Sequence, residues 1–288
     1  MFANHDVNLI PGMVKMPEYV QTRLYDFALC RKNSKHDPSE SMTFQDYLAD
    51  LVELASPENW GTDNKVLFNY VIHLFEKVAC DYNKNVGTDK AAEFLYMDDK
   101  HACFNTGLYT EKFEYIYCLF DKNRHPEAPS PWYLAGFFKE SANQLRPIGS
   151  LPSKVQLFDD PAQLIYDYRL PVRTNKDHIL SDPRNFDRLP LKLRELDDHA
   201  MLSRLFDGAV MEATKRVASN YTLAVPQYHK GSIQLLLPIC LTSNDPELAL
   251  AVHRDADAYS ARTCLTLDMA YNNARLIVKP EASWIRPA

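Results

Sequence analysis

The spacing of the apolar residues changes near residue 90, and this change limits the fold more than any other feature of the sequence. Residues 44–56 and 64–82 place apolar side chains three and four positions apart, which is typical of amphipathic helices. From about residue 91 the chain turns to short aromatic and β-branched runs that alternate with polar residues, such as "HACFNTGLYT" and "FEYIYCLF". We therefore predict an α+β protein, in which N-terminal helices precede an antiparallel-rich sheet.

The other expected elements follow from the same patterns. Residues 16–30 also show helical spacing, residues 132–140 read as a fourth strand of the meander, and residues 199–221 have the strict spacing of a long packing helix. Residues 142–195 are rich in loops and proline. The run at 233–242 reads as a strand in which Pro238 needs an edge or a bulge, and a hairpin turning near Ala256 follows it. Residues 268–278 fit either a helix capped by Asp268 or a second hairpin about "YNNA".

These elements predict a helical part at 1–90 and an α+β core at 91–288, packed as one unit. We expect the strands of 91–140 and 232–268 to share a sheet, or to face one another across the 199–221 helix.

Composition excludes several common kinds of protein. The eight glycines form no GxGxxG, GxxxxGK or GxSxG motif, which argues against a Rossmann site, a P-loop and a nucleophile elbow. The six cysteines form no CxxC, so we expect reduced thiols and no metal site, and no motif points to a cofactor. The longest apolar run is too short to span a bilayer, and the N-terminus lacks the features of a secretory signal. We expect a cytoplasmic protein with no membrane anchor.

Charge is distributed unevenly along the chain. The net charge is −6, but residues 169–230 hold eleven Lys and Arg against eight Asp and Glu. Arg173, Lys176, Arg184 and Arg188 lie in the denser part of this segment. It forms either a basic surface for RNA or a salt-bridged face exposed to solvent.

Two polar clusters are candidates for chemistry. Asp177 and His178, near Asp182 and Asn185, suit general acid–base catalysis, because a histidine beside a carboxylate titrates near working pH. The alternative is a loop histidine that only caps a turn. Asn105, in "NTG", is either a ligand-binding residue or part of a turn that needs unusual backbone angles.

A third cluster combines arginine and amide side chains at the edges of apolar stripes: Arg216, Asn220, Gln234, Asn272 and Arg275. If the last segment pairs near "IQLLLP", these groups converge and suit the recognition of phosphate and base edges. The alternative is a buried polar network that fixes packing. Arg216 can pair with Glu212 one helical turn away.

Arg275 has no acidic residue near it in sequence at a suitable spacing, as expected of a phosphate-binding arginine. A carboxylate that is distant in sequence is the alternative.

The chain also resembles a known family, called domain of unknown function 3825. The matching segments include "ENWG", "FNTGLYTEKFEYIYCLF", "PWYLAGF", "LPSKVQLFDDPAQLIYD", "GAVMEATKRVASNYTLAVPQY" and "TLDMAYNNARLIVKPEASWI", and they extend over about residues 51–288. The resemblance implies relatives that are fused or adjacent to RNA-binding modules of the LOTUS and cold-shock types, and it therefore implies a link to RNA. This chain carries no recognisable module of those types.

Two classes of function stay open at this point. The first is an enzyme that acts on RNA ends or on a nucleotide derivative, with His178 and Asp177 as acid–base groups, the arginines holding phosphate, and the reaction undefined. The second is a non-catalytic module that binds RNA or a nucleotide in an RNA-associated or defence assembly. If His178 lies beside a cleft formed by Arg216 and Arg275, the enzyme is favoured; if it lies on the far face, the binding module is favoured.

Overall fold

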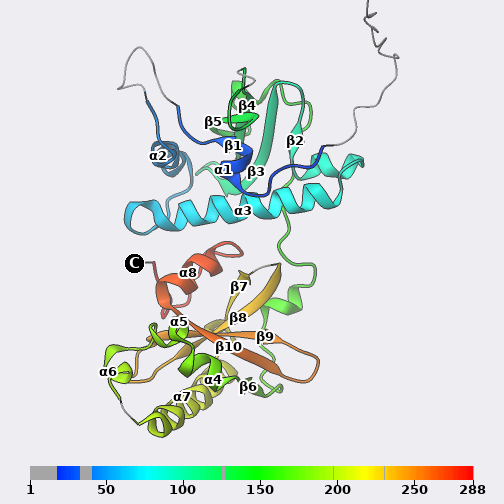
Figure 1. Cartoon of the computed structure of the whole chain (residues 1–288). Coiled ribbons are helices and arrows are strands. Elements are labelled where there is room, and N and C mark those ends of the chain that lie inside the picture. Colours follow the sequence, from blue (N-terminus) through cyan, green and yellow to red (C-terminus); the bar gives the residue numbers. More distant parts are fainter. Residues whose placement is uncertain (1–17, 33–40, 125–126, 197, 230, 288) are drawn as a thin grey trace, which may run out of the picture.

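The computed structural model describes residues 18–32, 41–124, 127–196, 198–229 and 231–287. It contains helices and two five-stranded sheets, which confirms the α+β prediction. The two sheets lie in different halves of the molecule (Figure 1). Residues 1–17, to which the predicted helical part extends, lie outside the described residues.

The first half combines the N-terminal helices with the meander. Its α-helices and strands are α1 (Leu24–Phe27), β1 (Ala28–Leu29), α2 (Phe44–Leu54), α3 (Lys65–Lys84), β2 (Tyr96–Met97), β3 (His101–Tyr109), β4 (Tyr115–Lys122) and β5 (Trp132–Lys139). The sheet order is β1-β5-β4-β3-β2, antiparallel except for the parallel pair β1–β5. Short 3-10 turns complete this half at Thr62–Asn64 and Asp89–Glu93.

Local chemistry explains where the helices of this half begin. Thr43 and Asp46 form a capping box at the start of α2, in which the Thr43 backbone N–H donates to Asp46 Oδ2 at 2.6 Å. The apolar stripe of α3 is buried against the meander, with Leu67, Val71 and Phe75 almost fully inaccessible. The structure therefore confirms the predicted helices at 44–56 and 64–82.

The second half holds the other sheet and the long helix. Its elements are β6 (Val172–Thr174), α4 (Lys176–Ser181), α5 (Pro183–Phe186), α6 (Leu191–Arg194), α7 (His199–Ser219), β7 (Val225–His229), β8 (Ser232–Ile239), β9 (Leu248–Arg254), β10 (Tyr259–Thr266) and α8 (Leu267–Arg275). The sheet order is β6-β10-β9-β8-β7, antiparallel except for the parallel pair β6–β10. Further 3-10 turns lie at Asn143–Leu145, Pro161–Leu164 and Tyr221–Leu223.

The second sheet is covered on both faces, by α7 on one side and by α8 on the other (Figure 1). The face toward α7 buries Leu235, Leu237 and Leu250 with Phe206 of that helix. Leu236 belongs instead to the cluster that includes the apolar residues of α8. This alternation follows from the two-residue period of a strand.

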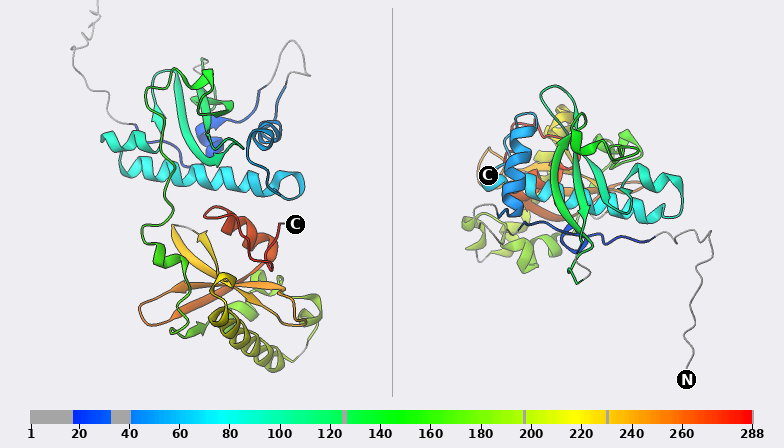
Figure 2. Two further views of the ribbon diagram at one scale, coloured as in Figure 1. Left: turned by 180° about the vertical axis from the view of Figure 1, so that it is seen from behind. Right: turned by 90° about the horizontal axis from the view of Figure 1, so that it is seen from above.

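Helix α8 lies between the second sheet and α3, and one apolar cluster extends across both halves. The cluster includes Phe75 from α3, Tyr271 from α8 and Leu265 from β10. The chain passes from the first half to the second through the segment between β5 and β6, seen from behind in green in Figure 2. The two halves therefore meet in sequence within this segment.

Several local predictions are confirmed. Residues 132–139 form β5, residues 199–219 form α7, and β9 and β10 form the hairpin whose turn contains Ala256. Leu236 is the last residue of β8 that pairs with β7, so Pro238, two residues later, has a neighbouring strand only on the β9 side. The predicted edge position for this proline is therefore present.

Other predictions are wrong. The strands of 91–140 and 232–268 form two separate sheets, and α7 lies on the face of the second sheet that is turned away from the first half. The helical spacing at 16–30 gives only the single turn α1 before the chain becomes strand β1, because Ala28 and Leu29 pair with β5. Residues 267–275 form a helix, but its N-cap is Thr266, whose hydroxyl accepts from the Met269 N–H, and not Asp268.

Candidate functional site

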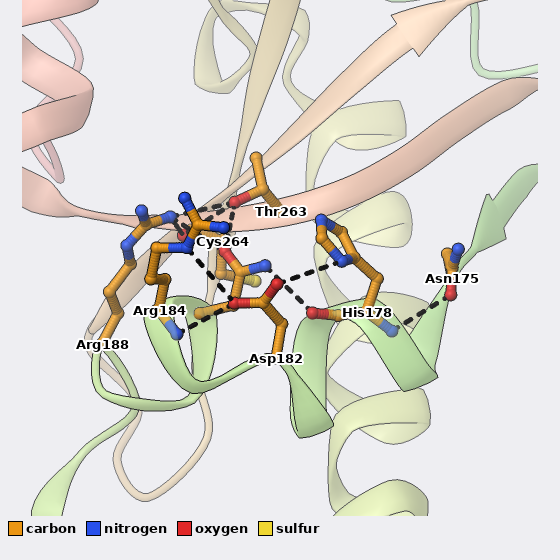
Figure 3. A network of polar contacts seen from close by, with 8 residues as sticks. Asn175, His178, Asp182, Arg184, Arg188, Thr263 and Cys264 are labelled. Carbon is orange, nitrogen blue, oxygen red and sulfur yellow. Dashed lines mark hydrogen bonds and ion pairs between the residues drawn. The ribbon is translucent and has the colours of Figure 1, made fainter.

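His178 lies in a polar network on the α7 side of the second sheet (Figure 3). Its backbone N–H donates to Asn175 Oδ1 at 3.1 Å, and its carbonyl accepts from Asn185 Nδ2 at 2.9 Å. Its imidazole Nδ1 lies 3.6 Å from Asp182 Oδ2, and the ring is about half exposed. Asn185 is also tied to Thr263 of β10, whose hydroxyl donates to its Oδ1 at 2.6 Å. The network anchors the short helices α4 and α5 to the sheet.

Asp177 lies next to His178 in sequence but does not pair with its imidazole. It is exposed, and no hydrogen bond or ion pair joins it to another described residue. The carboxylate that pairs with His178 is Asp182 instead, four residues along the chain. The histidine–carboxylate pair that the sequence suggested is thus present with a different acid.

Arg216 and Asn220 lie at the C-terminal end of α7, on the same side of the sheet as His178. Arg216 Nε lies 3.3 Å from Glu212 Oε1, which confirms the predicted pair, and its Nη1 donates to Cys240 Sγ at 3.0 Å. Asn220 caps the turn that follows, where its Oδ1 accepts from the Thr222 N–H. Both side chains hold the end of α7 to neighbouring loops.

Arg275 lies on the opposite side of the sheet and forms a buried ion pair. Its Nε and Nη2 donate to the two carboxylate oxygens of Glu58 at 2.5 and 2.8 Å. Its guanidinium carbon lies 4.8 Å from the Trp60 ring centre and 4.9 Å from that of Tyr70. Burial, the largest single effect, acts to lower the pKa of Arg275, but its hydrogen bonds to Glu58 and the charges of Glu58 and the neighbouring tyrosines together raise the pKa. The carboxylate that is distant in sequence, our alternative for this arginine, is therefore present.

Gln234 and Asn272 belong to a set of amide side chains that crosses from β8 through α8 to α3. Gln227 Nε2 donates to Gln234 Oε1 at 2.8 Å, and Asn273 Nδ2 donates to Gln227 Oε1 at 3.0 Å. Asn69 Nδ2 of α3 donates to Asn272 Oδ1 at 2.9 Å. Of the five residues predicted to converge, these two and Arg275 lie on the α8 side, whereas Arg216 and Asn220 lie beyond the sheet. The predicted convergence of all five is wrong, because α7 and α8 cover opposite faces.

Asn105 supports a β-bulge inside β3. The pairing of β3 with β4 shifts register between Asn105 and Tyr109, and Gly107 has a φ of 70° there. Asn105 Oδ1 accepts from the Gly107 N–H at 2.8 Å, and its Nδ2 donates to the Pro152 carbonyl. The residue is almost fully buried. The special backbone angle predicted for "NTG" is therefore present, in a bulge rather than at a turn between strands.

Three basic residues of the loop-rich segment have partners within the chain. Arg173 lies 2.8 Å from Asp257, Lys176 lies 2.8 Å from Asp207, and both pairs are open to solvent. Arg188 Nη1 donates to the Cys264 carbonyl at 2.8 Å. Arg184 is 91% exposed and lies 4.0 Å from Asp182, so this segment is salt-bridged in part.

A hollow that combines polar and apolar side chains lies between α3 and the pair α8–β7. It has a volume of about 460 Å³. Its lining residues come from three elements and the turn after β7: Asn69, Tyr70, His73, Glu76, Lys77, Cys80 and Lys84 of α3, Tyr228 and His229 of β7, Gly231, and Asn272, Asn273 and Leu276 at α8. We call this hollow the α3–α8 cleft. It contains Asn272 of the predicted site residues, but neither His178 nor an arginine.

The ammonium groups of the α3–α8 cleft gather about one acidic side chain, Asp81, near the C-terminal end of α3. Asp81 Oδ2 lies 2.5 Å from Lys77 Nζ, and Asp81 Oδ1 lies 3.8 Å from Lys84 Nζ. Two ammonium groups thus share one carboxylate. Burial, followed by the charge of Asp81, raises the pKa of Tyr228, so this phenol stays protonated and can donate a hydrogen bond at neutral pH.

The sequence interpretation missed most of this cleft. Lys77, Lys84 and Tyr228 drew no attention, because lysines on a helix are ordinarily exposed and tyrosines in a strand are ordinarily core. One signal was present: Asn69, His73, Lys77 and Lys84 recur at helical spacing beside the apolar stripe of α3. Within the described residues, no group of three His, Cys, Asp or Glu is placed to hold a metal ion. None of the described helices is long and apolar enough to cross a membrane.

Comparison with known proteins gives one match. A family model described as Domain of unknown function (DUF3825) matches residues 51–284, which is most of the chain. No curated protein and no solved structure matches the chain.

Proposed function

Because the chain belongs to the family Domain of unknown function (DUF3825), whose description names no activity, we propose its function from the geometry of the α3–α8 cleft. We propose that the protein is a binding module for a nucleotide or for one nucleotide of an RNA. The observation that carries the proposal is the meeting of amide, aromatic and lysine side chains in a cleft of about 460 Å³.

The size and chemistry of the cleft support this ligand. Small-molecule sites have volumes of about 300–1,000 Å³, mostly apolar walls and a few well-placed polar groups. Tyr70, Tyr228 and Leu276 supply apolar surface, and Asn69 and Asn273 supply amides. Amide side chains pair with base edges, aromatic rings stack on bases, and ammonium groups bind phosphate.

A binding module is favoured over an enzyme by the position of His178. This histidine lies on the α7 side of the sheet, whereas the cleft lies on the α8 side. A general acid or base must come within hydrogen-bonding reach of the reacting group. The second candidate, an enzyme that acts on RNA ends or a nucleotide derivative, rests on the exposed His178–Asp182 pair and would need a separate substrate site beside α4.

The proposal extends to partners and location. RNA or a nucleotide in the cytoplasm is the partner we propose.

The test is a binding measurement with matched lysine variants. Isothermal titration with the four ribonucleoside 5′-monophosphates, and with a short single-stranded RNA, should give saturable one-site binding. Lys84→Gln should weaken binding about tenfold, the effect of losing one hydrogen bond to a charged group. Lys112→Gln, an exposed lysine on the β3–β4 hairpin, should leave it unchanged. Equal affinities for the two variants, or no binding to the wild type, would exclude the cleft as the site.

A further inference from the structure

The polar side chains that α3 contributes to the cleft are arranged in a fixed order along the helix. Asn69, His73, Glu76, Lys77 and Lys84 all line the cleft. With a rise of about 1.5 Å per residue, Asn69 and Lys77 lie roughly 12 Å apart along the axis, and Lys84 lies roughly 10 Å farther on. Glu76 and Lys77 are neighbours in sequence, but the Glu76 carboxylate reaches back to His73, whereas the Lys77 ammonium group reaches forward to Asp81. The charged groups therefore leave an amide end, a carboxylate after it and a lysine end.

The amide end has hydrogen-bonding capacity in reserve. Asn69 and Asn273 each use an Nδ2 to donate, to Asn272 and Gln227 respectively. In the described part of the chain, neither Asn69 Oδ1 nor Asn273 Oδ1 accepts a hydrogen bond. Each amide thus keeps an acceptor and one N–H, which is the pattern that pairs with a base edge carrying a donor beside an acceptor.

The lysine end carries a surplus of positive charge. Lys77 and Lys84 face the single carboxylate of Asp81, so these three groups carry a net charge of +1. The Lys84 side chain is 73% exposed and can turn toward a ligand. Phosphate is the anionic group that an ammonium donor of this kind binds well.

Glu76 lies between these two ends and needs a separate explanation. Its carboxylate lies 3.5 Å from His73 Nδ1, and its side chain is more than half exposed. A carboxylate repels phosphate, so its position near the lysine end is unfavourable for an anion unless the ligand presents donors at this point. The hydroxyl groups of ribose are such donors, and a carboxylate that accepts from the 2′-hydroxyl is an established means of binding ribose.

From this order we infer that the α3–α8 cleft selects ribonucleotides over deoxyribonucleotides, with the base at Asn69 and Asn273, the ribose hydroxyls on Glu76 and the phosphate at Lys77 and Lys84. The inference rests on the proposed function and goes beyond it. It makes Glu76 the residue that determines sugar specificity, because the 2′-hydroxyl is what distinguishes RNA from DNA at a binding site.

The test compares each ribonucleoside 5′-monophosphate with its 2′-deoxy counterpart by isothermal titration. The wild type should prefer the ribonucleotide about tenfold or more, as expected from one hydrogen bond to a charged group. Glu76→Gln should lose most of this preference while it still binds nucleotide. Glu53→Gln, an exposed glutamate on α2, should retain the preference in full.

The possible outcomes separate the two proposals. If no nucleotide binds the wild type, the proposed function fails. If both sugars bind the wild type equally, or if Glu76→Gln keeps the wild-type preference, the proposed function stands and the inference about Glu76 is wrong. A 5′-phosphorylated oligoribonucleotide competing with the monophosphate identifies the natural source: competition at similar affinity supports an RNA end, and its absence supports a free ribonucleotide as the ligand.

Discussion

Replacing Arg275 with lysine separates a structural arginine from a ligand-binding one. Arg275→Lys keeps the positive charge but loses the second of two hydrogen bonds to Glu58 and the flat stacking on Trp60 and Tyr70. A hydrogen bond to a charged group contributes about 1.5–3 kcal/mol, and a cation–π contact about 0.5–2 kcal/mol. Since lysine retains part of both interactions, we expect the free energy of unfolding to fall by about 2–4 kcal/mol.

Urea denaturation followed by the fluorescence of the three tryptophans measures this loss. Arg262→Lys is the matched control, because Arg262 is exposed and forms no ion pair or hydrogen bond with the described residues. A surface substitution of this kind changes stability by less than about 0.5 kcal/mol. If Arg275→Lys is as stable as Arg262→Lys, the ion pair with Glu58 does not stabilise the fold, and a ligand role for Arg275 returns.

Three further perturbations test other parts of the account. Gly107→Ala should lower the free energy of unfolding by more than about 1 kcal/mol, because Gly107 has a φ of 70° and a Cβ there would lie 3.1 Å from Tyr70 Oη. Thermal unfolding measures this loss, with Gly208→Ala as the control. Hydrogen bonds from the side chain and backbone of Arg169 lower the pKa of Asp167 to about 2, below the unfolded value of about 3.9. The ionised Asp167 therefore stabilises the fold above about pH 4, and this contribution is lost as the pH falls toward 2. Asp167→Asn should therefore show a shallower decline in melting temperature between pH 5 and pH 2 than the wild type, and identical curves would contradict this. Four cysteines are buried: Cys30, Cys103, Cys118 and Cys264. They should resist iodoacetamide until the protein unfolds, because burial raises the pKa of each thiol, to about 12 for three of them. Fast modification of any of them in the native protein would contradict their buried placement.

The elements that could be predicted from sequence are those whose side-chain pattern is local. Helix α7 and the β9–β10 hairpin were found because their apolar residues repeat at periods of 3.6 and 2. The first helix was overpredicted, because helical spacing at 16–30 says nothing about the pairing of Ala28 and Leu29 with β5, a strand about 100 residues later. The cap of α8 was displaced by two residues, since Thr266 and Asp268 are both good N-caps.

The candidate site could be predicted only in part, because it depends on contacts that are distant in sequence. Asn69 and Asn272 are 203 residues apart, and Glu58 and Arg275 are 217 residues apart. The pattern of a strand shows that its two faces differ but does not show which helix covers which face. Arg216 was therefore grouped with Arg275, although the second sheet separates them.

Cys80 offers the most direct measurement on the α3–α8 cleft. It lines the cleft and is partly exposed, whereas Cys240 is also partly exposed but lies beyond the second sheet, beside Arg216. The rates at which iodoacetamide modifies each thiol can be followed by peptide mass spectrometry in the presence of increasing ribonucleoside monophosphate. We predict that nucleotide slows the modification of Cys80 in a saturable manner, in step with the affinity found by titration, and leaves the rate at Cys240 unchanged. Bound nucleotide that leaves the Cys80 rate unchanged, or that slows both thiols equally, would contradict a nucleotide site between α3 and α8.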